Sequence, residues 1–359
     1  MGDSACVPTD AAGIHELTEK IKAKALELGF ARVGVTTADD IEGYEDRLLA
    51  RDGYTERWNT KDPDSVLRKA ARPRDKVPGA KSVISLVRAV GGIDFPANLL
   101  QHVGRIYLGR CYVPPDDTIE GKRVLLFEEY LASQGVNSLY DHTNMQLVDR
   151  AIAARAGLVT YGRNNFAYAG EHGSFIVMVS IPVDVELECE VHEPRRPCPP
   201  DCRKCIEACP THAMDDEGNL DPGRCVLYSC FMPGAMKNTE VTDLIGLRIH
   251  GCDACQEACP RNKVVLEAPK AKDPYLEYLS GEFDLRKLLF CDDDYYERCV
   301  KPVMYNYIHD VDIFRQNAAI AMGNSGDASY VPDLQRAAQE GSEQVRRFAL
   351  HAIERLTAR

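Results

Sequence analysis

The sequence has no apolar run of the roughly eighteen residues that a helix needs to cross a bilayer. It also has no G-x-G-x-x-G loop after a strand and no G-x-x-x-x-G-K-[ST] loop, so dinucleotide and P-loop sites are not supported. Its first residues, Met1 to Cys6, lack the basic region of a secretory signal and lack a twin arginine. These absences predict a cytoplasmic protein that makes no membrane contact.

Positive charge is scarce. The 359 residues carry 43 Lys and Arg against 55 Asp and Glu, a formal net charge of -12. Affinity for nucleic acid depends largely on basic side chains that neutralise phosphates, so this balance argues against a polyanion partner without excluding a local basic patch. The length predicts two or three domains, each with a hydrophobic core of its own.

Cysteine, by contrast, is abundant, with 14 residues. One run is CPPDCRKCIEACP at 198–210, and a second is CDACQEACP at 252–260. A 4Fe–4S cluster needs four thiolates around one small volume, and in two-cluster ferredoxins the Cys-Pro of each run ligates the other cluster. The two runs therefore predict two 4Fe–4S clusters, whose ligands would be Cys198, Cys202, Cys205, Cys209, Cys225, Cys252, Cys255 and Cys259.

Other uses of these cysteines are weaker explanations. Structural zinc also binds C-x-x-C pairs but does not call for the Cys-Pro crossover. Disulfides need an oxidising compartment, which the absence of a secretory segment argues against. Cys198 and Cys202 are one residue farther apart than the usual spacing, which leaves Cys189 as a substitute first ligand. The other spare cysteines are expected to be mostly buried apolar side chains, at positions 6, 111, 230, 291 and 299.

Strands and helices alternate in the first half of the chain. Apolar residues recur at helical spacing over 14–28, and further helices are expected at 120–134 and 145–156. Short strands are expected at 31–35, 81–88 and 136–140, and the apolar run 175–181 is typical of a central strand buried on both faces. This alternation predicts an α/β domain over residues 1–190.

A charged, proline-rich stretch, 183–200, separates this domain from the cysteine runs. The predicted cluster domain covers 191–265, and a helical region follows over 266–359. Helices are expected at 314–323, 330–339 and 343–356, a pattern typical of one or two HEAT-type repeats. So short a stack must pack on the rest of the protein to bury its apolar faces.

Several stretches together resemble the epoxyqueuosine reductases, a family of cobalamin-dependent enzymes with two 4Fe–4S clusters that is related to the reductive dehalogenases. The most specific is IHGCDACQEACPRN at 249–262. The others occur in the same order, as LGFARVG at 28–34, VPGAKSVI at 77–84, DRAIAARAGL at 149–158, GRNN at 162–165 with Gly173-Ser174, and NAAIAMGNSG at 317–326. The resemblance covers most of the chain.

The resemblance implies an N-terminal α/β, nitroreductase-like domain that holds cobalamin, a bacterial-ferredoxin-like two-cluster domain, and a HEAT-like helical tail that engages tRNA in that family. Electrons would pass from an external flavodoxin or ferredoxin through both clusters to cobalt. By the family's ligand order, one cluster would use Cys198, Cys202, Cys205 and Cys259, and the outer one Cys209, Cys225, Cys252 and Cys255. The implied corrinoid contacts are Arg163, Asn164, Gly173 and Ser174; a Gly-bracketed loop alone would fit ordinary loop chemistry equally well.

The chain departs from the family where the substrate is reduced. The family's proton-donating aspartate lies six residues before the position of Asp149, where this chain has Thr143. Threonine is no useful acid at neutral pH, whereas Asp141 could serve if burial raised its pKa, and Tyr140 and His142 are further candidates. The family's Gly-Arg-Asp-Tyr-His stretch is GRCYV here, at 109–113. From Asp310 onward, seven acids face six arginines and no lysine, which is weak for a tRNA-binding tail.

These observations predict a cobalamin-dependent iron–sulfur reductase that removes oxygen or halogen from a substrate other than epoxyqueuosine. One alternative is a true epoxyqueuosine reductase that acts on tRNA. Another is an electron-transfer protein without catalysis, although a carrier does not need about 190 residues ahead of its clusters. The predicted catalytic candidates are Tyr140, Asp141 and Thr143, and the substrate is either a small molecule or tRNA.

Overall fold

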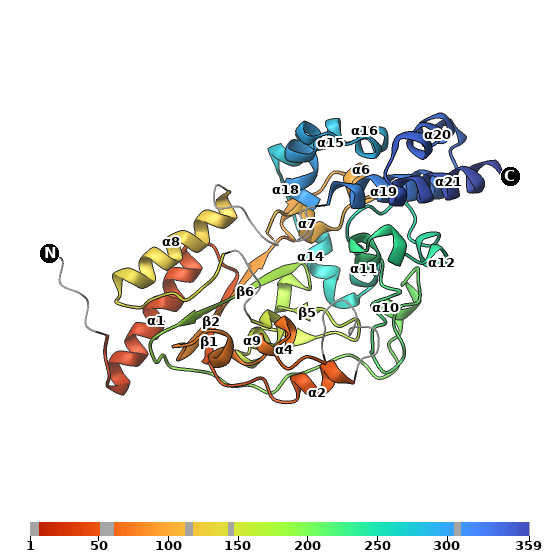
Figure 1. The fold of residues 1–359 in the computed structure, drawn as a ribbon. Helices are drawn as coiled ribbons and strands as arrows, with labels where there is room; N and C mark the ends of the chain where they lie inside the picture. The colour runs from red at the N-terminus through yellow and green to blue at the C-terminus, as the bar shows by residue number, and fades with distance from the viewer. Residues whose placement is uncertain (1–6, 51–60, 112–117, 143–146, 305–309, 359) are drawn as a thin grey trace. The chain divides into compact units, whose positions relative to one another are not determined.

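A computed structural model describes residues 7–50, 61–111, 118–142, 147–304 and 310–358. Thr143 and Cys6 lie outside these ranges, as do the last two residues of the GRCYV stretch. The chain forms two compact units (Figure 1). Unit 1 comprises residues 1–91 and 114–202, and unit 2 comprises 92–113 and 203–359. No helix in the described part of the chain is both long enough and apolar enough to cross a membrane.

Unit 1 is built on a three-stranded antiparallel sheet in the order β1-β2-β6. The strands are β1 (Arg32–Thr37), β2 (Ser82–Ala89) and β6 (Ile176–Val183). The apolar run 175–181, expected to be a central strand, forms β6. Within this sheet β6 pairs only with β2, so β6 is an edge strand and β2 is the central one. The strand expected at 136–140 is wrong, because that segment contributes only an isolated bridge from Ser138 to Val183.

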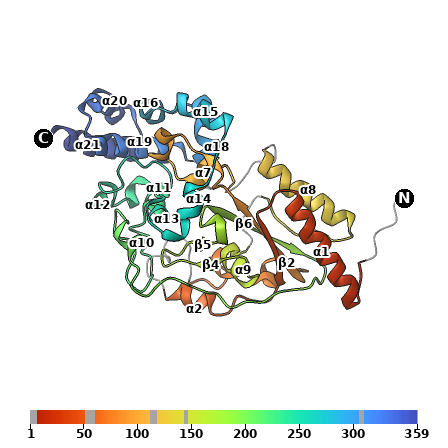
Figure 2. The same ribbon diagram turned by 180° about the vertical axis from the view of Figure 1, so that it is seen from behind.

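Helices cover both faces of this sheet. The first face meets α1 (Ala11–Glu27) and α8 (Ile119–Ser133), which lie side by side in Figures 1 and 2. Alternation along β2 explains the layers, because Ile84 and Leu86 pack in the core with α1 and α8. Val83 and Val87 point to the opposite face, where α9 (Asp149–Arg155) packs. Unit 1 is therefore an α/β/α sandwich, and the expected mixed α/β class is confirmed.

Unit 2 joins segment 92–113 to the first cysteine run from Arg203 onward, to the second run and to the C-terminal helices, while Cys198 and Cys202 belong to unit 1. The β-strands β3 (Ile93–Asp94) and β7 (Ala271–Lys272) pair in parallel. The backbone N–H groups of Ile249 and His250 donate to the carbonyl of His102 at 2.8 and 3.1 Å. The sequence placed segment 92–113 in the first domain, whereas these contacts place it in unit 2. The three-domain division itself stays a prediction.

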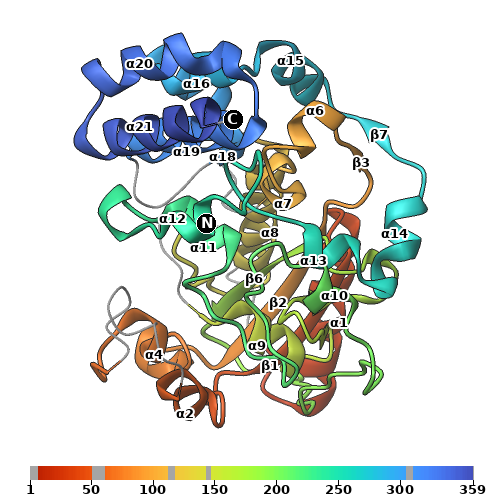
Figure 3. The same ribbon diagram turned by 90° about the vertical axis from the view of Figure 1, so that its right-hand side faces the viewer.

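The last part of unit 2 is a stack of helices (Figure 3). The three helices expected from the sequence are present as α19 (Val311–Ser325), α20 (Val331–Glu340) and α21 (Glu343–Thr357). α19 packs against α21 and against α16 (Leu285–Leu289). Every residue from Gln316 to Gly323 is buried, so α19 is the core of the stack rather than a surface helix. Gly326 ends α19 in the left-handed conformation that favours glycine.

Candidate cluster centre and reductase site

Cysteines from both runs meet in one apolar cluster within unit 2. Cys205 and Cys209 are buried there with Ile206, Ala213 and Met214, and Cys225 and Cys255 pack against them. Two short helices carry the runs, α10 (Lys204–Glu207) and α13 (Ala254–Glu257), and they contact each other. Residues about fifty positions apart in the sequence are therefore neighbours, as two adjoining clusters require.

The two runs also fold alike. Arg203 and Asp253, which precede α10 and α13, have nearly the same backbone angles, with φ of -117° and -109° and ψ of 5° and 2°. Cys209 N donates to Ile206 O at 3.1 Å, and Cys259 N donates to Gln256 O at 3.2 Å. This repetition indicates two half-sites of one design, each ending in the Cys-Pro whose proline cannot continue the helix.

Burial raises the pKa of the thiols of Cys225, Cys252 and Cys255 above the ordinary value. Nearby thiols, among them Cys209, add to this effect at Cys255. A backbone N–H, from Ala213, points at the sulfur of Cys209 at 3.3 Å. Iron would replace the thiol protons and remove the cost of gathering these groups in an apolar site, so the residues fit a cluster chemically.

Among the described residues, no three Cys, His, Asp or Glu side chains are close enough to share a single metal ion. Three or more ligands around one ion are the geometry of a single-metal site. The four thiolates of a cubane each bind a different iron, so they stand farther apart.

Two of the predicted catalytic residues, Tyr140 and Asp141, lie in unit 1 beside a small polar network, and Thr143 is outside the described residues. Tyr140 and Asp141 are half-buried, and the Tyr140 ring meets the His142 ring edge-on at 4.9 Å between centroids. His142 Nε2 lies 2.6 Å from a Glu128 carboxylate oxygen, and Ser138 donates to the other oxygen of Glu128 at 2.5 Å. Burial, together with the charge of Asp149, raises the pKa of Tyr140 to about 12. Tyr140 is therefore a poor acid at neutral pH.

The predicted corrinoid contacts lie close together in the chain. The hydrogen bonds described for Arg163 and Asn164 go to other residues of the protein. Arg163 donates to the carbonyls of Pro199 and Pro200 at 3.3 and 3.0 Å, in the loop ahead of Cys202. The buried Asn164 side chain bonds the hydroxyl of Tyr168 at 3.0 Å and holds the hairpin of β4 (Thr160–Tyr161) and β5 (Ala167–Tyr168).

Gly173 and Ser174 follow that hairpin. Gly173 has φ of 58° and ψ of -140°, a conformation that a side chain would strain, and Ser174 is buried. The corrinoid role of these four residues stays an expectation from the family resemblance.

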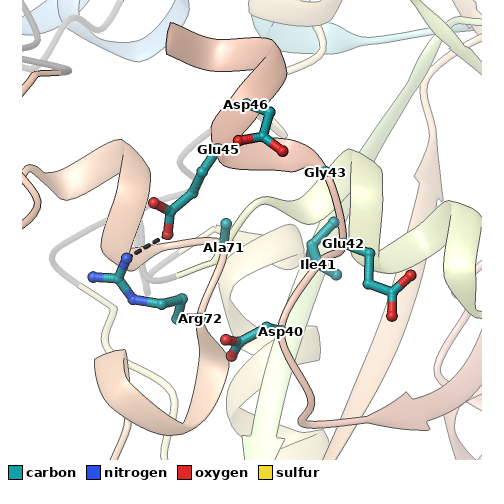
Figure 4. Close-up of a pocket in the computed structure, with 8 residues that line it drawn as sticks. All are labelled: Asp40, Ile41, Glu42, Gly43, Glu45, Asp46, Ala71 and Arg72. Carbon is teal, nitrogen blue, oxygen red and sulfur yellow. Dashed lines mark hydrogen bonds and ion pairs between the residues drawn. The ribbon is translucent and has the colours of Figure 1, made fainter.

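A pocket of about 200 Å³ lies elsewhere in unit 1 (Figure 4). Acidic side chains line it, and Glu45 is paired with Arg72 at its wall and with Arg68 at 2.6 Å. None of the predicted site residues lines this pocket. It is much smaller than a tetrapyrrole.

Comparison with known proteins decides the family. Residues 198–262, which include all eight predicted ligands, match a 4Fe-4S double cluster binding domain. The epoxyqueuosine reductase of Bacillus subtilis (strain 168) is 24% identical over 382 residues, across 96% of this chain and 97% of that protein. The epoxyqueuosine reductase of Escherichia coli (strain K12) is 30% identical over 260 residues, across 70% of this chain and 66% of its own.

A crystal structure of selenomethionine-labelled epoxyqueuosine reductase matches 96% of this chain and 91% of its own, with a TM-score of 0.77 and 25% identity. A crystal structure of epoxyqueuosine reductase with a tRNA-Tyr epoxyqueuosine-modified tRNA stem loop matches with a TM-score of 0.75 and 24% identity over the same shares. The chain belongs to the epoxyqueuosine reductase family. It is an oxidoreductase.

Two charged groups of this family member were not predicted from the sequence. Asp149, half-buried, begins α9 beside Ser180, and desolvation raises the pKa of its carboxyl to about 7. Lys237 is buried in unit 2. A signal existed for Lys237, because it is the one lysine between the two cysteine runs.

Proposed function

We propose that this chain is a cobalamin-dependent iron–sulfur reductase, in which two 4Fe–4S clusters pass electrons from an external flavodoxin or ferredoxin toward a corrin that removes oxygen or halogen from a substrate. The observation that carries the proposal is that cysteines of both runs, Cys205, Cys209 and Cys255, meet with Cys225 in unit 2. Family membership supports cobalamin, and the cofactor would supply low-potential cobalt chemistry. The chain's own part is to hold the clusters, exclude water and provide a proton.

The ligands of the two clusters would be the eight cysteines of the motif. Cys205 and Cys209 are buried and the other six are half-buried. An apolar surrounding stabilises the less highly charged oxidised state of a cluster, which lowers its reduction potential. The nitroreductase-like, ferredoxin-like and HEAT-like descriptions of the parts belong to this proposal as well. So does a cytoplasmic location.

Two observations favour a substrate other than epoxyqueuosine in tRNA. The first is Thr143 at the position of the family's proton donor. The second is the use of arginine in the tail, where most guanidinium groups bind the protein itself. Arg315 donates to the Cys291 carbonyl, Arg347 to the Gly234 carbonyl, and Arg355 pairs with Asp243 at 2.7 Å. Such arginines are poorly placed to neutralise phosphates.

True epoxyqueuosine reduction on tRNA is the second candidate. It is supported by the length of the match, which includes the C-terminal helices, and by the related reductase crystallised with an epoxyqueuosine-modified tRNA stem loop. A carrier without catalysis is the weakest candidate, because enzymes match the chain over 96% of its length.

The deciding experiment is metal analysis with a visible spectrum, on protein reconstituted anaerobically with cobalamin. The proposal expects about eight iron atoms and about one cobalt per chain. Zinc in place of iron would refute it, and iron without bound corrin would leave only an electron carrier. Gel shift and turnover with epoxyqueuosine-containing tRNA then separate the two substrates. Conversion of that tRNA would establish the second candidate.

A further inference from the structure

Lys237 is a buried cation, and the described residues give it no acidic partner. Only 5% of the residue is exposed. In the described part of the chain no carboxylate lies within ion-pair distance of its ammonium group, whose hydrogen bond goes to the side-chain oxygen of Asn317. A buried ammonium costs several kcal/mol unless an anion compensates it. A counter-charge is therefore to be expected nearby.

Asn317 ties Lys237 to the second cysteine run. Its amide nitrogen donates to the carbonyl of Cys230 at 3.0 Å and to the carbonyl of Ile249 at 2.9 Å. Ile249 is three residues ahead of Cys252, and Cys230 is five residues after Cys225. The buried amide of Asn317 thus links Lys237 to two backbone segments, each of which carries a predicted ligand, Cys225 or Cys252.

The positive charge of Lys237 acts on the side chain of Cys230. Its thiol is fully buried, and the charge of Lys237 acts on it together with those of Cys225 and Cys252. Gly251, the neighbour of Cys252, donates its backbone N–H to the same thiol. The lysine and the two predicted ligands therefore share one small region of low dielectric, where charges interact strongly.

The other groups that face Lys237 provide no negative charge. They are Asn317 from α19, Cys230 from α11 (Val226–Phe231), and Phe348 from α21, whose ring centre lies 5.9 Å from the ammonium nitrogen. Arg347, also from α21, donates to the backbone carbonyl of Lys237 at 3.3 Å and adds positive charge. Burial lowers the pKa of Lys237 to about 7 in the protein without clusters.

We propose that Lys237 is the internal counter-charge of the cluster bound by Cys225 and Cys252, and that it takes up a proton when this cluster is reduced. The inference rests on the proposed function, which supplies the cluster. A cubane with four thiolates is anionic, and reduction by one electron adds a further negative charge. The electron comes from the flavodoxin or ferredoxin donor, the proton comes from solvent, and the neutral amine becomes ammonium.

The direction of the effect follows from linkage. Reduction favours the charged lysine, so the pKa of Lys237 is higher in the reduced protein than in the oxidised protein. Between those two values, reduction is accompanied by proton uptake. The potential of this cluster therefore falls as the pH rises, and becomes constant once the lysine stays neutral in both states.

Potentiometric titrations of the anaerobic holoprotein, followed by electron paramagnetic resonance at about pH 6 and about pH 9, test this role. In the wild type, one of the two cluster potentials should fall between these pH values. Lys237→Met should lower that potential at the acid end, abolish its pH dependence and converge with the wild type at the alkaline end. Lys237→Arg, which stays charged, should keep the potential high at both.

The control is Lys287→Met. Lys287 is half-exposed and pairs with Glu282 at 3.1 Å, so its removal should leave both potentials unchanged. Two clusters whose potentials are the same in Lys237→Met and wild type would overturn the role of Lys237. If the Met variant does not retain its iron, a wild-type pH dependence in Lys237→Arg would overturn it equally. A wild-type protein without two clusters would instead refute the proposed function.

Discussion

Unit 1 and unit 2 bury charge in opposite ways. In unit 1, the charge of the buried Arg88 acts on the Asp149 carboxyl and opposes in part the effect of desolvation on its pKa. In unit 2, Lys237 and a group of thiols are buried, and none of the described residues places a carboxylate beside the lysine. Unit 1 therefore sets an acid near its buried base, whereas the described part of unit 2 does not.

The difference extends to how each core is filled. Unit 1 packs a sheet between helices, and its largest buried side chains include Phe127 and Leu131 of α8. The cysteine region of unit 2 has helices of four to six residues, too short to be stable alone. We infer that unit 1 folds on apolar burial and that the cysteine region of unit 2 depends on its clusters.

Removal of iron should separate the units most clearly. Chelation under anaerobic conditions should remove most amide protection around α10, α11 and α13, because metal binding and folding are coupled in such sites. Protection of β2 and β6 should change little. Hydrogen exchange with mass spectrometry measures both regions in one sample. Equal amide protection of α10, α11 and α13 with and without iron would contradict the inference that this region depends on its clusters. Recovery of protection after reconstitution with iron is the control for irreversible damage.

Loss of one ligand should have the next largest effect. Cys255→Ala should lower the iron content by about four atoms per chain, because one cubane loses a thiolate. Cys291→Ala is the control, since Cys291 is a buried free thiol that lies outside the cysteine runs. Iron analysis and visible absorbance measure the change. A Cys255→Ala protein with full iron content would show that this cysteine is not a ligand.

Periodicity explains why much of the fold could be predicted. The three C-terminal helices and α1 show the 3.6-residue pattern of one buried face, and the apolar runs of β2 and β6 are long enough to be recognised as strands. The strand expected at 136–140 fails because Val136 packs into the core with α8 and Leu139 into another apolar cluster, and only Ser138 forms a bridge. Segment 92–113 could not be placed, since its partners lie about 150 residues away.

The candidate site also has a part that the sequence predicts and a part that it does not. The cysteine ligands were predictable because cluster chemistry dictates both residue type and spacing. The charge of Asp149 was not, since its environment is made by Ser180 and Tyr140 from other parts of the chain. Lys237 was missed for the same reason: its burial arises from α19 and α21.

A core substitution in unit 1 tests whether the two units are independent. Phe127→Ala should lower the free energy of unfolding of unit 1 by about 3 to 5 kcal/mol, because the ring is fully buried and stacks edge-on with Phe30 at 6.1 Å. Thermal unfolding by circular dichroism measures this loss, and iron content should stay at the wild-type value. Loss of iron on this substitution would show that the clusters, two of whose predicted ligands (Cys198 and Cys202) belong to unit 1, depend on the core of that unit.

The smallest effect concerns pH. Burial raises the pKa of Asp149 from 3.8 to about 7, so between these values native unit 1 binds more protons than the unfolded chain, and its stability falls as the pH rises. Asp149→Asn removes the titrating group and should flatten this fall, a change of at most a few kcal/mol. Denaturant unfolding at a series of pH values measures the slope. The control is Asp64→Asn, at an exposed position, which should keep the wild-type slope. A wild-type slope in Asp149→Asn would contradict the prediction, because it would mean that the Asp149 carboxyl is ionised throughout and compensated by Arg88.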